Sequence, residues 1–154
     1  MWHAVRTAIA ATLSVLLARL VRMPEAYWAV IATLVVMQSP LSSTVPLAIQ
    51  RIVASALGAS LGAIEAAYFG ANLVAFALTI FVLGLIAMAF RLERVGYSYA
   101  GMTLAIIVLI PRPEAPWIAA AHRFAEVSIG ILVALAVVVV WRVEHRLFGK
   151  ALAE

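Results

Sequence analysis

The chain has 154 residues, of which 66% are hydrophobic and 12% are charged, and its mean hydropathy is +1.11. Soluble proteins are about half apolar and about a quarter charged, so this composition excludes an ordinary soluble domain. The absence of cysteine further excludes disulfides, thiolate metal sites and cysteine nucleophiles. Because six membrane-spanning helices of roughly 20 residues would use about 120 residues, we expect residues 1–154 to form a single transmembrane domain of the all-α class.

The first half of the chain predicts three helices separated by turn signals. Residues 4–20 are apolar and end in arginines before Pro24, which disfavours helix in the residue before it. Residues 26–38 form a short apolar run that leads into a polar segment. Pro46 stands where the first turn of a helix accepts proline, and the helical pattern of residues 47–68 follows it.

The second half of the chain predicts three more helices. Residues 73–90 contain no charge and end at a cluster of arginine and glutamate. Residues 97–110 end at a proline-rich connection, and residues 117–141 lead into a charged tail. We therefore predict six transmembrane helices in all.

The lysines and arginines indicate how these helices are oriented, because cytoplasmic loops collect positive charge. With the amino terminus inside, seven of the 11 lie on the cytoplasmic side and four lie on the opposite side. This split predicts a multi-pass protein with both termini in the cytoplasm. Anionic lipid headgroups account for the pI of about 10.1, so nucleic acid is not an expected partner.

The two halves of the chain resemble each other in where arginine and glycine fall. The resemblance predicts two repeats, residues 1–72 and 73–144, as an alternative to a bundle without internal repeats. With three helices in each half, the second half would cross the membrane upside down, as an inverted repeat. A shift of 72 residues aligns Arg19 with Arg91, Arg22 with Arg94, Tyr27 with Tyr99, Arg51 with Arg123 and Gly58 with Gly130.

Arg51 and Arg123 are candidates for function because each lies within a predicted membrane helix. A charge in the hydrocarbon region costs about 2.5 to 3.5 kcal/mol on insertion scales, so such residues normally face the protein interior or a water-filled cavity. One interpretation is that both side chains are shallow enough to snorkel to the headgroups. The other is that two buried guanidiniums attract and orient a carboxylate through paired donors.

Small residues accompany each arginine at helical spacing. Ser55, Gly58 and Gly62 follow the first arginine, and Gly130 follows the second. Glycines spaced as GxxxG commonly let two helices approach closely, so packing is their commoner role. The alternative is an open groove that leads away from the arginine.

His122, Arg123 and Glu126 form the densest ionisable cluster of the second half, and their spacing makes them neighbours on one helix face. Glu126 either neutralises Arg123 in a structural pair or carries a proton whose exchange is coupled to substrate movement. Glu65 lies near the outer end of its helix, and we expect it at the membrane interface.

The sequence offers no sign of enzymatic chemistry. It contains neither a GxxxxGK[ST] phosphate loop nor an HExxH zinc motif. We therefore expect a protein that is not an enzyme, with no catalytic residue, no cofactor and no metal site.

Four segments together resemble the membrane region of the fusaric acid resistance and aromatic acid exporter family: HAVRTAIAATLSVLLARL, PEAYWAVIATLVVMQ, LAIQRIVASALGASLGA and HRFAEVSIGILVAL. The resemblance covers nearly the whole chain through short motifs. It implies a protein of the bacterial inner (plasma) membrane that exports aromatic or other organic acid anions, with six helices per membrane unit and assembly into oligomers. Most relatives add a second membrane unit or a cytosolic helical domain, so gating by such a domain is not expected here.

The resemblance also implies site residues, matched one by one. The family's arginines correspond to Arg6, Arg51 and Arg123, the glycines of its third helix to Gly58 and Gly62, and the acid and glycine of its last helix to Glu126 and Gly130.

Three functions are compatible with these features. The first is an organic-anion exporter, with proton coupling through Glu126 left open. The second is an anion channel, which would use the same residues without coupling, and the third is a non-transporting membrane subunit of a larger assembly. The expected partners are membrane lipid, the organic anion, a second copy in a homodimer and a periplasmic adaptor. The substrate path of the exporter would comprise Arg51, Ser55, His122, Arg123 and Glu126.

Overall fold

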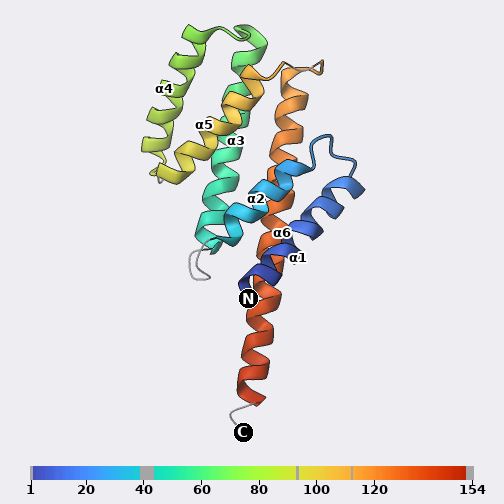
Figure 1. The fold of residues 1–154 in the computed structure, drawn as a ribbon. Coiled ribbons are helices and arrows are strands. Elements are labelled where there is room, and N and C mark those ends of the chain that lie inside the picture. Colours follow the sequence, from blue (N-terminus) through green and yellow to red (C-terminus); the bar gives the residue numbers. More distant parts are fainter. Residues whose placement is uncertain (1, 39–43, 93, 112, 152–154) are drawn as a thin grey trace. The chain divides into compact units, whose positions relative to one another are not determined.

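The computed structural model describes residues 2–38, 44–92, 94–111 and 113–151. Six helices and no strand occur within these ranges, which confirms the all-α class. The helices are α1 Trp2–Leu20, α2 Tyr27–Met37, α3 Thr44–Tyr68, α4 Leu73–Ala89, α5 Arg94–Leu109 and α6 Pro116–Ala151 (Figure 1).

The helices extend beyond the predicted ranges by three residues or more at three places. α3 begins at Thr44, so Pro46 lies within its first turn, where backbone N–H groups have no intrahelical acceptor. α5 begins at Arg94 instead of residue 97. α6 continues to Ala151, well past the predicted end at Trp141, because the charged segment that follows contains no proline to end the helix.

The chain divides into two compact units. Unit 1 comprises Met1–Ala48 and Glu126–Glu154, and unit 2 comprises Ile49–Ala125. Unit 1 therefore holds α1, α2 and the later part of α6, whereas unit 2 holds most of α3, all of α4 and α5, and the first part of α6. The boundaries fall within α3 and α6, so the units do not coincide with the predicted repeats.

In unit 1, α1 and α2 pack side by side (Figure 1). α1 buries four residues spaced four apart, Arg6, Ala10, Ser14 and Ala18, which therefore lie along one side of the helix. Three of the four are small, which allows close approach of the neighbouring helices. Arg6, the fourth, is the charged member of this buried stripe.

In unit 2, α4 and α5 form an antiparallel hairpin (Figure 1). The core of the unit joins α3, α4 and α5 through the buried side chains of Ala54, Leu83, Ala100, Leu104 and Val108. Three of these residues follow one another at a spacing of four on α5, so one face of that helix supplies most of the cluster.

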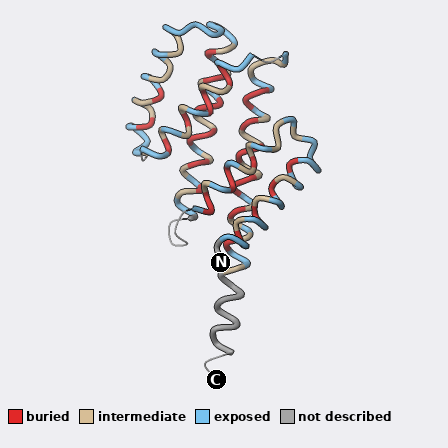
Figure 2. The backbone as a smooth tube through the Cα atoms, viewed as in Figure 1, coloured by how far each residue is buried: buried red, intermediate tan, exposed pale blue. Residues whose placement is uncertain are grey.

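α4 is apolar on all sides, yet it buries only Leu83 and Ala87 (Figure 2). Its other large side chains are exposed, among them Leu73, Phe81 and Met88, each with more than half of its surface accessible. Such an exposed apolar surface is typical of a helix that faces lipid, because lipid tails are as apolar as its side chains.

Two helices are long and apolar enough to cross a membrane by length and composition, Val45–Tyr68 and Pro116–Trp141. The helices Tyr27–Met37, Leu73–Ala89 and Arg94–Leu109 are apolar but shorter. At 1.5 Å per residue the 11 residues of α2 span about 17 Å, against roughly 30 Å for the hydrocarbon core of a bilayer. Within the described residues the structure thus gives two clear spanning helices where the sequence predicts six.

The ends of α1 and α4 have the same backbone motif. The residue that closes each helix is an arginine with positive φ, 58° at Arg22 and 52° at Arg91. In each case the next backbone N–H donates to the carbonyl oxygen five residues earlier, at 2.9 Å, from Met23 to Ala18 and from Leu92 to Ala87. This is the Schellman pattern, in which a left-handed residue ends a helix by satisfying its last carbonyls.

Candidate functional site

Arg51 lies on the buried side of α3, against α5. Its exposed fraction is 6%, and its Cζ atom lies 3.9 Å from the centroid of the Tyr99 ring. Such a contact contributes about 0.5 to 2 kcal/mol, with the larger value for desolvated pairs. Among the described residues, Nε and Nη1 of Arg51 have no hydrogen-bond acceptor. Stacking therefore positions the guanidinium and leaves two donors unused.

Ser55 follows Arg51 by one helical turn and is also buried. Its Oγ has no hydrogen-bond partner within the described part of the chain. A buried polar group without a partner costs about 1 to 3 kcal/mol, so two such side chains on one helix face call for a functional reason. An anionic ligand would supply acceptors for both.

Gly58 and Gly62 continue this face of α3 and contact α5. A Cβ atom at Gly58 would overlap the carbonyl group of Ala100, and one at Gly62 would lie 3.2 Å from Cα of Leu104. The two glycines therefore let the backbones of α3 and α5 approach closely, as GxxxG pairs do. The sequence also allows an open groove along this face of α3. In the structure, α5 covers the face at the two glycines.

A cavity of about 340 Å³ lies on a different side of α3, between it and the first part of α6. Ser60 and Ala63 line it from α3, and Trp117 and Phe124 line it from α6. Ser60 is the central residue of a GxSxG sequence, but it lies in mid-helix and its hydroxyl donates to the Ala56 carbonyl at 2.8 Å. A nucleophilic serine in that motif requires a strand-to-helix turn, so this serine is not one.

His122 and Arg123 differ in their surroundings although they are adjacent in α6. Arg123 is 2% exposed, whereas the His122 side chain is 37% exposed and its Nδ1 lies 3.3 Å from Oε2 of Glu114. Glu114 precedes α6 in the proline-rich connection. The sequence groups His122 with Arg123 and Glu126, and the structure gives His122 this additional acidic partner.

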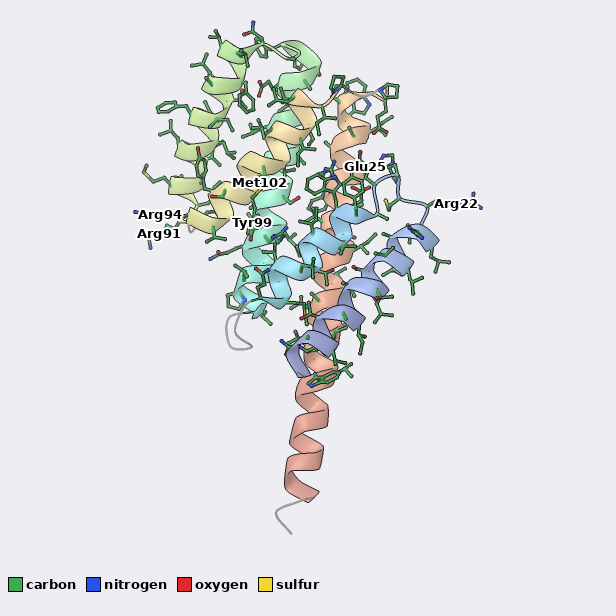
Figure 3. All side chains as sticks on the ribbon, viewed as in Figure 1. Arg22, Glu25, Arg91, Arg94, Tyr99 and Met102 are labelled. Atoms are coloured by element: carbon green, nitrogen blue, oxygen red, sulfur yellow. The ribbon has the colours of Figure 1, made fainter. Side chains whose placement is uncertain are left out.

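Glu126 is the first residue of the α6 segment that belongs to unit 1, and it is 1% exposed. Its Oε1 accepts a hydrogen bond of 2.8 Å from the backbone N–H of Glu25, just before α2. Glu25 in turn accepts a bond of 3.0 Å from Nε1 of Trp28 through its own carboxylate. One carboxylate oxygen of Glu126 thus holds the start of α2, where Glu25 lies (Figure 3), against α6.

Gly130 lies one turn further along α6 and packs against α2. A Cβ atom at Gly130 would overlap the carbonyl group of Ala29. The Thr33 hydroxyl lies 2.9 Å from the Gly130 carbonyl and 2.8 Å from that of Ala29. This glycine therefore joins α6 to α2, as Gly58 joins α3 to α5.

Glu65 is the buried acid of unit 2, with an exposed fraction of 1%. The expected position at the membrane interface stays a prediction, because burial inside the protein does not fix depth in the membrane. Thr79 of α4 is its polar neighbour, but within the described residues neither carboxylate oxygen has a hydrogen bond of good geometry. The residue lies on the same side of α3 as Arg51, fourteen positions later.

Sequence reasoning did not find the parts played by Tyr99, Glu25 and Glu65. The repeat alignment pairs Tyr99 with Tyr27, which was a signal for Tyr99, but nothing in the spacing places its ring under Arg51. For Glu25 and Glu65 the contacts come from other helices, so no local pattern reveals them. No group of three metal-ligating side chains occurs among the residues that the structure describes.

Exposed apolar helices together with buried arginines are features of membrane proteins, whose charged side chains normally face the protein interior. The model of the fusaric acid resistance protein-like family matches residues 11–137, which is most of the chain. The chain belongs to this family, as the sequence motifs predict, and is thereby a membrane-associated protein with a role related to transport or export. No curated protein and no solved structure gives a significant match.

Proposed function

We propose that the protein exports aromatic or other organic acid anions across the bacterial inner membrane, with Arg51 and Arg123 as its anion-selective elements. The observation that carries the proposal is the Arg51 site, a buried guanidinium stacked on Tyr99 with two donors unused. The family supports the direction of transport, because export of an organic acid would provide resistance to it. The proposal includes no enzymatic step.

The chemistry of a carboxylate explains why guanidiniums would select it. An anion that enters a low-dielectric region must replace its hydration by other donors, or the transfer is prohibitive. A guanidinium offers two parallel donors that match a carboxylate, and it cannot lose its charge at physiological pH. Arg51 belongs to α3 and Arg123 to α6. In this proposal the anion binds to the two guanidiniums one after the other.

We further propose six membrane crossings with both termini in the cytoplasm and two inverted repeats. The repeats are supported by equivalent contacts in the two units, where Gly58 of α3 meets Ala100 of α5 and Gly130 of α6 meets Ala29 of α2. In each contact the third helix of one half packs on the second helix of the other.

The functional unit in this proposal is a homodimer, because one six-helix unit of this size has little interior of its own. Membrane lipid covers the exposed side of α4, and a periplasmic adaptor would continue the export route. Of these partners, only lipid has a surface in the structure that argues for it, the exposed apolar residues of α4.

The proposal is tested by measuring benzoate flux in proteoliposomes under set pH gradients and voltages. Arg51→Ala and Arg123→Ala should each weaken apparent affinity about tenfold or more, which corresponds to the roughly 1.5 to 3 kcal/mol of hydrogen bonds to a charged group. The lysine variants should keep a weaker and less selective flux, because they retain the charge and lose the planar fork. Arg94→Ala, which removes an exposed arginine of unit 2, is the matched control (Figure 3).

The outcomes separate the competing functions. Folded alanine variants that transport like the parent would show that the arginines are structural and would refute the anion path. Flux that follows voltage and ignores the pH gradient would assign the protein as an anion channel. Absence of flux from every variant and from the parent would favour a non-transporting subunit.

A further inference from the structure

Glu65 is a buried acid to which the anion path proposed above assigns no role. Burial of an unpaired carboxylate in a low-dielectric interior is costly, so the side chain needs either a proton or a cationic partner. Glu65 has neither an ion pair nor a well-formed hydrogen bond among the described residues. An ionisable residue in such a position within a membrane helix is by default a candidate for function.

The groups around Glu65 argue for a proton instead of a metal cation. α4 contributes the Thr79 hydroxyl, and α5 contributes apolar side chains such as Ile107 and Leu104, which face the preceding turn of α3. One carboxylate and one hydroxyl are far fewer oxygens than the six or more that a hard cation requires. A proton needs only the carboxylate.

A cavity lies next to the turn of α3 that contains Glu65. This cavity of about 240 Å³ reaches Ala66, the next residue on α3, and Glu114 contributes to its wall. Oε2 of Glu114 lies 3.3 Å from Nδ1 of His122, so the wall of this cavity contains a carboxylate with an imidazole beside it. The cavity also reaches Gly70, in the connection between α3 and α4, which links it to the end of the helix.

The position of Glu65 relative to Arg51 gives the proton a role in transport. Fourteen residues of helix separate the two side chains, or about 21 Å along the axis. In the proposed topology α3 runs outward, so the anion meets Arg51 near the cytoplasm and approaches Glu65 near the outer face. An ionised Glu65 would repel the anion there, and a neutral one would let it pass.

We propose that Glu65 is a proton-operated gate on the outer part of the anion path, an inference that rests on the export function proposed above. The carboxylate takes a proton from a hydronium ion on the outer side, which leaves water behind, and the neutral acid admits the anion. Loss of that proton to water on the inner side restores the charge and closes the path. One proton would thus enter for each anion that leaves.

The test compares Glu65→Gln, Glu126→Gln and the parent in two measurements. Gln is neutral at every pH and keeps the size of the side chain. Efflux of benzoate from the parent should fall as the outer pH is raised, whereas Glu65→Gln should keep the high flux of the acidic condition throughout. Glu126→Gln should retain the outer-pH dependence, because Oε1 of Glu126 is held by the Glu25 N–H.

The second measurement does not depend on transport. Infrared spectra of the full-length protein in lipid, recorded over a pH titration, should contain a protonated carboxyl band that Glu65→Gln removes. Glu154→Gln, which also removes one of the chain's seven carboxyl side chains, should keep the band. Sodium gradients should not replace proton gradients in driving benzoate efflux.

Four results would overturn the inference. Two concern Glu65→Gln: a variant that keeps the outer-pH dependence of the parent, or a folded variant that loses flux at every pH. The other two are loss of the outer-pH dependence in Glu126→Gln and benzoate efflux driven by a sodium gradient. A parent that moves no organic acid would instead refute the export function. The infrared band then decides the proton site alone, since its loss in Glu65→Gln supports proton binding and its retention refutes it.

Discussion

Arginine occupies a left-handed backbone position after both α1 and α4, where glycine is the usual residue. A residue with a Cβ atom is strained by roughly 1 to 2 kcal/mol in this conformation. Glycine avoids that strain, but its greater freedom in the unfolded state offsets part of the gain. Both side chains point away from their units (Figure 3). Their positive charge at the ends of predicted membrane helices offers a reason for keeping arginine, since it helps to fix orientation.

Replacement of Arg22 by glycine should therefore stabilise the folded protein by about 0.5 to 1 kcal/mol, which relieves the left-handed strain. Thermal unfolding in mild detergent, followed by circular dichroism, would show a higher midpoint. Arg19→Gly is the matched control, because it removes the same charge from the last turn of α1, where glycine should destabilise by about 1 kcal/mol. Equal effects of the two variants would mean that charge, and not backbone strain, governs stability there.

At the scale of single side chains, the sequence predicts which residues of the candidate site share one face of a helix. The geometry of one helix is local, so the common face of Arg51, Ser55 and Gly58 follows from their numbers alone. The stacking of Arg51 on Tyr99 depends on how α5 is placed, which no periodicity within α3 contains. The same reason hides Glu65, because its burial comes from neighbouring helices.

At the scale of helices, glycine decides which pairs can pack backbone to backbone. Gly58 and Gly101 offer a comparison, since one faces the Ala100 carbonyl and the other has Ile80 at 3.9 Å as its nearest neighbour. Gly58→Ala should destabilise the protein by about 1 to 3 kcal/mol through overpacking against backbone, which cannot give way as a side chain can.

The matched variant Gly101→Ala should be neutral or stabilising by up to about 1 kcal/mol, because alanine favours helix and space is present. Midpoints of thermal unfolding of the two variants, measured in the same detergent, provide the comparison. A Gly58→Ala variant as stable as Gly101→Ala would mean that α3 and α5 separate readily, and that the glycine contact is not what holds them.

Helix number follows from the sequence because proline, glycine and charged clusters interrupt the apolar runs at defined places. Helix length does not, as α2 illustrates: composition alone does not show that this segment forms a helix of 11 residues. The end of α6 shows the converse, because a charged segment without proline continues the helix beyond the apolar run.

At the scale of the whole molecule, the duplication proposed above would explain why similar contacts recur in two units that the repeat boundary does not separate. Each unit contains the first two helices of one half and a glycine-bearing third helix of the other, α6 in unit 1 and α3 in unit 2. Each half would thus depend on the other for its core. Such an exchange would arise if two copies of one half first paired as separate chains and later became joined.

An inverted arrangement makes a sharp prediction about the two left-handed turns. If the halves are upside down relative to each other, the turn after α1 faces outward and the turn after α4 faces the cytoplasm. Val21 and Phe90 flank these turns and are exposed, and the chain has no native cysteine, so single cysteines there can be labelled without background. A membrane-impermeant maleimide added to intact cells should label Val21→Cys and not Phe90→Cys, with both labelled after permeabilisation.

Ala71→Cys, in the connection between α3 and α4, should label from outside like Val21→Cys. This position is preferred to Gly70, where the φ of 61° would strain a cysteine. Labelling of Val21→Cys and Phe90→Cys from the same face would place α1 and α4 in the same orientation, which three crossings per half cannot produce, and would refute the inverted repeat together with the six-crossing topology.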